Sequence, residues 1–173
     1  MTTELDRFLV MFDGLVVLAN DWIAATPADK LDWAPEGGDD IKFGDRISDV
    51  TIKNIYGHVT LSEYSWSKML RDCADGTELG MDKNPKIVTG LESDRFFDVA
   101  KQVHADSMAI MEAYGEAVLS KSIIHTGRRY TGMGFLWAMY AHHAYHLGNI
   151  DTYLRLATGT APDFFNFHRT EMV

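Results

Sequence analysis

Apolar residues recur at three- and four-residue steps along four long stretches of this 173-residue chain. Such steps place the apolar side chains on one face of an α-helix, because the helix has 3.6 residues per turn. We find neither a strong strand alternation nor an internal repeat in the sequence. The pattern therefore predicts an all-α fold in which four amphipathic helices bury their apolar faces together as a four-helix bundle.

The first predicted helix, Glu4–Ala25, carries its apolar stripe to Trp22 and ends at Thr26-Pro27. It ends there because the residue before a proline avoids the α region. A long connection with two prolines and three glycines follows, before the second helix. Its apolar residues predict that it packs against the helices; they are Leu31, Trp33, Ile41 and Phe43.

Three further helices complete the predicted bundle. Thr89 and Glu92 form a T-x-x-E pattern, which is typical of the capping box at a helix start. We interpret the segment between the third and fourth helices as a short loop, and the aromatic tail as lying across the bundle or meeting a partner subunit. The predicted ranges are Ile47–Asp72, Leu91–Ser120 and Met133–Leu156.

Composition narrows the class of protein. The length and the 46% hydrophobic content fit one globular domain over residues 1–173. A net charge of −9 argues against nucleic-acid binding and against acidic lipid surfaces. Cys73 is the only cysteine, which excludes an internal disulfide and fits the reducing cytoplasm. Charged residues interrupt the apolar N-terminal stretch, so we expect an amphipathic helix there, with no signal peptide and no membrane span.

The stretch AHHAYHLGNI holds three of the seven histidines. His142 and His146 are four residues apart and share a helix face, so their imidazoles can converge on one metal ion. His58, on the inward stripe of the second predicted helix, is the best third ligand. Three histidines leave coordination positions open to water or substrate, which is the pattern of catalytic zinc sites.

Other interpretations compete with this site. A single histidine on an apolar face is more often a hydrogen-bonded core residue than a ligand, and a histidine pair also arises on solvated faces. His143 could pair with His146, but its position favours a flanking role. The H-E-x-x-H and paired E-x-x-H patterns are absent, as are the glycine-rich nucleotide motifs. The remaining histidines are interpreted as ordinary polar residues: His104, His125 and His168.

Three segments resemble the DinB/YfiT-like superfamily of metal-binding bundles. DKLDWAP resembles the segment before the second helix of that family. NIYGHVTLSEYSWSKML resembles its helix with one histidine, and HHAYHLGNI is similar to its H-x-x-x-H-x-G-Q signature. Together these segments cover about the first half of the chain and its fourth helix. One departure is Asn149, which stands where the family usually has glutamine.

The resemblance implies an up-down-down-up four-helix bundle, often a homodimer. It implies a divalent metal ion, such as zinc, nickel or iron, held by His58, His142 and His146. It also implies an enzyme that transfers or isomerises a small-molecule substrate with a low-molecular-weight thiol. A metal-dependent hydrolase and a non-catalytic, metal- or ligand-binding dimeric module are the alternatives.

Four other residues carry side chains that could take part in such an enzyme. Arg128 and Arg129 could bind a carboxylate of the thiol. We favour the interpretation that both arginines lie on a solvent-exposed loop and have no binding role. Glu63 lies about 140° around the helix from His58, so we do not assign it a catalytic role. We interpret Cys73 as structural.

Overall fold

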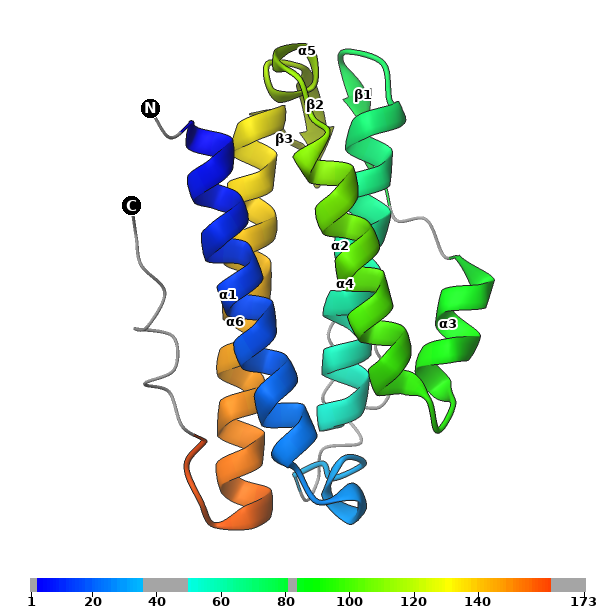
Figure 1. Ribbon diagram of the computed structural model, residues 1–173, viewed down its shortest axis with the longest axis vertical. Coiled ribbons are helices and arrows are strands. Elements are labelled where there is room, and N and C mark those ends of the chain that lie inside the picture. The colour runs from blue at the N-terminus through cyan, green and yellow to red at the C-terminus, as the bar shows by residue number, and fades with distance from the viewer. Residues whose placement is uncertain (1–2, 36–49, 81–83, 163–173) are drawn as a thin grey trace.

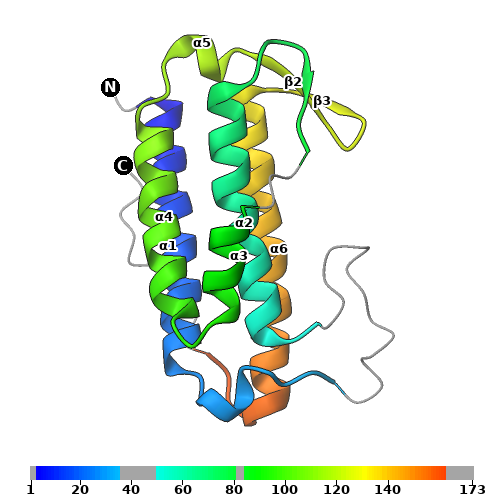
Figure 2. The same ribbon diagram turned by 90° about the vertical axis from the view of Figure 1, so that its right-hand side faces the viewer.

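The structure is a computed structural model that describes residues 3–35, 50–80 and 84–162. It is mostly helical, with one small sheet. Four long helices lie side by side: α1 (Glu4–Ala25), α2 (Ile52–Asp72), α4 (Phe96–Glu112) and α6 (Gly132–Thr158) (Figures 1 and 2). The shorter elements are η1 (Ala28–Lys30), β1 (Thr77–Glu78), α3 (Pro85–Glu92), α5 (Glu116–Leu119), β2 (Ser122–His125) and β3 (Arg128–Thr131).

The apolar faces of the long helices form the core. α2 packs against both α4 and α6, and α1 packs against the same two helices. One end of the core is built around Phe8, Phe12 and Phe135, and the other around Ile55 and Ile150, all of them at most 1% exposed. Burying side chains of this size stabilises a fold by about 1.5–3 kcal/mol each. The all-α prediction is confirmed for the described residues, apart from the small sheet.

The predicted range of α1 is confirmed at both ends. Thr3 caps the helix by accepting a hydrogen bond from the Asp6 amide, while the Asp6 carboxylate accepts from the Thr3 amide. This reciprocal pair is a capping box. Within the described residues, α1 is also the one helix long and apolar enough to cross a membrane, but almost half of that stretch is buried inside the protein.

The start of α2 differs from the prediction. Thr51, expected inside the helix, is its N-cap, and its hydroxyl accepts a hydrogen bond from the Asn54 amide. The predicted start, Ile47, lies outside the described residues, as do Ile41 and Phe43. The connection packs against the core as expected at Leu31 and Trp33.

The prediction of the third helix, Leu91–Ser120, is wrong in both its start and its length. Thr89 and Glu92 lie inside the separate helix α3, which is instead capped by Asn84, whose side chain accepts hydrogen bonds from two backbone amides. The chain turns at Ser93 before α4 begins, and α4 ends at Glu112, ahead of the short α5. The T-x-x-E spacing was thus a chance match within a helix.

The segment between α5 and α6, predicted as a loop, forms a β-hairpin. β2 pairs antiparallel with β3, and β1 adds to the other edge of β2 in parallel. Thr126 and Gly127 link the two hairpin strands with φ angles of 51° and 74°. Two consecutive positive φ angles suit the tight two-residue turn that matches the strand twist. The strands have four residues each, which is too short for a clear alternation.

Candidate metal centre

His58, His142 and His146 come together where α2 packs against α6. One ring nitrogen from each lies within 4.8 Å of the others. The Nε2 atoms of His58 and His142 are 3.2 Å apart. The ring centroids of His142 and His146 are 4.6 Å apart, as expected for side chains one helical turn apart. The structure therefore brings together all three histidines that the sequence singled out.

This spacing fits a shared metal ion. Two nitrogens bound to one tetrahedral zinc ion at 2.0–2.1 Å lie about 3.3 Å apart. The separation of 3.2 Å between His58 and His142 is close to that value. Three imidazoles also suit nickel and iron, so the donor set does not select one metal.

Burial favours the form of histidine that binds metals. His146 is 4% exposed, and its removal from water lowers its pKa to about 4. The imidazole is therefore neutral at pH 7, as metal coordination requires. His58 and His142 are half-buried, which leaves the site within reach of small molecules.

Two aromatic rings flank the three histidines. Trp66 from α2 makes an edge contact with His142, with ring centroids 4.8 Å apart. Tyr145 makes a similar contact with His146 at 5.0 Å, and its side chain is 59% exposed. These contacts restrict the rotation of the His142 and His146 rings.

Comparison of the chain with protein-family models, with curated proteins and with solved structures found no match.

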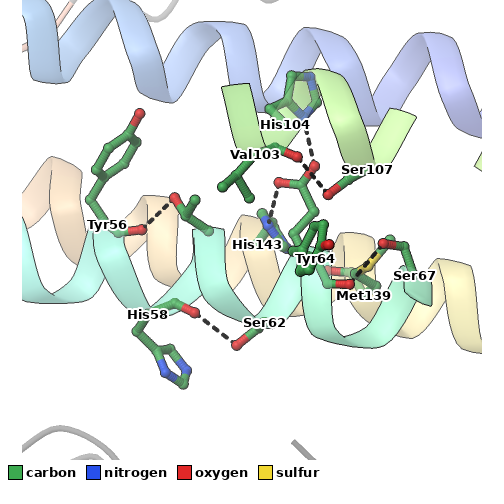
Figure 3. A network of polar contacts seen from close by, with 12 residues as sticks. Tyr56, His58, Ser62, Tyr64, Ser67, Val103, His104, Ser107, Met139 and His143 are labelled. Carbon is green, nitrogen blue, oxygen red and sulfur yellow. Dashed lines mark hydrogen bonds and ion pairs between the residues drawn. The ribbon is translucent and has the colours of Figure 1, made fainter. Parts of the chain in front are cut away.

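A second polar cluster, not foreseen from the sequence, lies in the core. Glu63 is 1% exposed, and its Oε1 atom lies 2.7 Å from Nδ1 of His104 on α4. The other ring nitrogen of His104 lies 3.2 Å from a carboxylate oxygen of Asp13 on α1. Figure 3 shows His104 and His143 directed toward this interior region from different helices, while His58 points away from it. The interpretation of His104 as an ordinary polar residue missed this role.

The hydrogen bonds of His104 define its charge. A carboxylate can only accept, so an imidazole between two carboxylates donates from both nitrogens and is protonated. Burial alone would raise the pKa of Glu63, but His104, and to a smaller extent His143, outweigh burial and lower that pKa. Burial would likewise lower the pKa of His104, but Glu63 and Asp13 together raise it. The three residues therefore form a charged cluster in which Glu63 and His104 are buried, while the Asp13 side chain is 53% exposed.

His143 also lies in the core, where the sequence suggested a flank. It is 5% exposed, and its Nδ1 donates to the carbonyl oxygen of Met139 at 3.0 Å. Its Nε2 lies 3.6 Å from Oε2 of Glu63. This separation is longer than an ordinary hydrogen bond, and His143 contributes less than His104 to the lowered pKa of Glu63.

The other candidate residues named from the sequence lie outside the cluster of His58, His142 and His146. Arg128 and Arg129 are exposed on β3, and Arg129 donates to the Ser122 hydroxyl. Cys73 caps the end of α2. His125 packs against Trp66, and its Nδ1 donates to the Leu79 carbonyl oxygen. His168 lies outside the described residues.

Proposed function

We propose that the protein binds one divalent metal ion through His58, His142 and His146. The observation that carries this proposal is the convergence of three imidazoles, with two Nε2 atoms 3.2 Å apart, at the contact between α2 and α6. Burial of His146 in its neutral form supports it further. Three protein ligands leave at least one coordination position for another molecule.

The proposed activity is a reaction between a low-molecular-weight thiol and a small electrophilic substrate. A divalent ion in this site would lower the pKa of a bound thiol. His58, His142 and His146 would hold the ion, while Trp66 and Tyr145 would fix the rings and border the space next to them. The resemblance of the histidine segments to the DinB/YfiT-like superfamily supports the choice of a thiol.

We further propose that the long helices form the up-down-down-up bundle of that superfamily. In support, the chain runs in one direction along α1 and α6 and in the opposite direction along α2 and α4 (Figure 1). The same resemblance supports a homodimer, and the single cysteine and the acidic composition support a cytoplasmic location.

Metal analysis of the purified protein tests the first part of this proposal. We expect about one ion per chain in the wild type, and loss of the ion in H58A and H146A. H125A is the matched control, because His125 also contacts Trp66 but lies outside the cluster. Absence of metal from the wild type after incubation with zinc, nickel and iron salts would contradict the proposal.

A conjugation assay tests the second part. The metal-loaded protein is mixed with a reactive electrophile and each of several thiols, including glutathione, mycothiol and bacillithiol. We expect turnover with at least one thiol and none in H58A. Metal binding with no turnover of any thiol, together with ester cleavage by the same preparation, would favour the hydrolase alternative.

A further inference from the structure

Asn149 presents a buried acceptor close to the three histidines. It lies three residues after His146 on α6, and residues at this spacing are neighbours on a helix surface. Its Oδ1 atom is buried and has no hydrogen bond of ordinary geometry among the described residues. A buried carbonyl oxygen without a donor costs about 1–3 kcal/mol. The position of this amide therefore needs a physical reason.

The His146 ring is the group that this amide reaches. Burial has the largest effect on the pKa of His146 and lowers it, but the Asn149 side chain acts in the opposite direction and raises it. An oxygen acceptor raises the pKa of an imidazole because it stabilises the charged form, whereas an N–H donor lowers it. The carbonyl side of the amide, which is the buried Oδ1, is therefore the side that faces the ring.

The two ring nitrogens of His146 have different surroundings. Nδ1 is buried, while the ring lies beside those of His58 and His142, with centroids 5.1 Å and 4.6 Å away. We therefore assign Nε2 to an ion shared with those two histidines. An imidazole that binds a metal through one nitrogen donates from the N–H of the other, usually to an oxygen. In His146 that donor is Nδ1.

We propose that Asn149 is a positioning residue of the metal site, whose Oδ1 accepts a hydrogen bond from Nδ1 of His146. The bond holds the ring with Nε2 directed at the ion, and it makes Nε2 a more basic ligand. This inference rests on the proposed metal site and adds to it a side chain that does not touch the ion. It also gives a physical role to the amide at position 149.

Zinc titration of two variants of nearly equal shape tests the role of the acceptor. N149L keeps the branched side chain but removes both polar groups, while N149D keeps an acceptor oxygen. Loss of a partner that orients a ligand typically weakens metal binding about 10-fold or more. We expect at least that increase in the dissociation constant of N149L, and no weakening in N149D. A purely structural role would leave N149L unchanged, so equal affinities of N149L and the wild type would overturn the proposal.

A charge control separates the hydrogen bond from simple attraction. N149D adds a negative charge, which attracts a cation whether or not it bonds to His146. T152D adds the same charge at an exposed position of α6, three residues further along the chain. We expect T152D to bind zinc like the wild type. Tightening of T152D to match N149D, or weakening of N149D to match N149L, would count against the acceptor role.

A crystal structure of the metal-free wild type tests the contact by itself. We expect Oδ1 of Asn149 within about 2.7–3.2 Å of Nδ1 of His146. An amide turned away from the ring would contradict the inference. Failure of the wild type to bind zinc would instead refute the proposed function, while this structure would still decide whether Asn149 holds the ring.

Discussion

His142 and His143 are neighbours in the sequence but belong to different clusters. Successive residues are separated by about 100° around a helix, so the two side chains leave α6 in different directions. His142 faces His58 on one side of α2, while His143 faces the core near Glu63. This difference separates the proposed metal site from the charged cluster around Glu63.

The buried pair of Glu63 and His104 should make stability depend on pH. Glu63 has a lowered pKa, so its contribution is present above its ordinary value of 4.5 and is lost as the pH falls through the lowered pKa. His104 has a raised pKa, so its contribution is present below 6.5 and is lost as the pH rises through the raised pKa. The pair is therefore most stabilising between these two ordinary values.

Denaturant unfolding of the wild type and E63Q across this pH range measures the effect. We expect E63Q to be less stable by roughly 3 kcal/mol between pH 4.5 and 6.5, and by less on either side. Comparing the two proteins cancels the contribution of His146, whose lowered pKa destabilises the metal-free fold in acid. E112Q, at an exposed position on α4, should behave like the wild type. A difference independent of pH would contradict the assignment of charge.

The sequence indicated the cluster of three histidines but not the pair of Glu63 and His104, and the difference has a physical reason. His142 and His146 are visible because helical periodicity relates positions four residues apart. Glu63 and His104 are 41 residues apart on different helices. Their contact depends on how α2 and α4 pack together, which no local spacing encodes. The 140° offset correctly separated Glu63 from His58, but it could not indicate what Glu63 would meet.

At the scale of elements, two glycines of α6 have opposite roles. A Cβ atom on Gly132 would lie 2.1 Å from the carbonyl oxygen of Val118, so only glycine fits where α6 begins beside α5. A Cβ atom on Gly148 would meet nothing within 4 Å. Gly148 therefore allows no close helix approach among the described residues.

Alanine substitutions at these two glycines should change stability in opposite directions. We expect G132A to lower the free energy of unfolding by roughly 2 kcal/mol, because backbone must move to relieve the contact. We expect G148A to raise it by about 0.5–1 kcal/mol, because alanine favours the helix interior. Thermal unfolding followed by circular dichroism measures both. A stable G132A variant would contradict the tight junction between α5 and α6.

The long helices were easier to predict than the short elements between them. The long apolar stripes located α1 and α6 to within two residues at each end. The hairpin was missed because its strands have only four residues each, which is too short for a clear alternation, although β2 also pairs with the distant β1. The break at Ser93 was missed because the apolar pattern continues across the corner between α3 and α4.

For the whole molecule, a bound metal would join α2 to α6. The unfolded chain holds its three histidines far apart, so a ligand that needs all three stabilises the folded state. At a free metal concentration 100 times the dissociation constant, we expect about 2.7 kcal/mol of stabilisation, or an increase of roughly 5–10 °C in the melting temperature. The increase should be absent from H142A. An equal increase in that variant would indicate metal binding elsewhere.

The central claim is that one metal ion is shared by His58, His142 and His146, and anomalous X-ray diffraction tests it most directly. Data are collected from crystals of the zinc-loaded protein on both sides of the zinc absorption edge. We predict a single strong anomalous peak between α2 and α6, about 2.0–2.1 Å from one nitrogen of each of the three imidazoles. A peak at another location, or rings that remain without an ion in saturating zinc, would contradict the account.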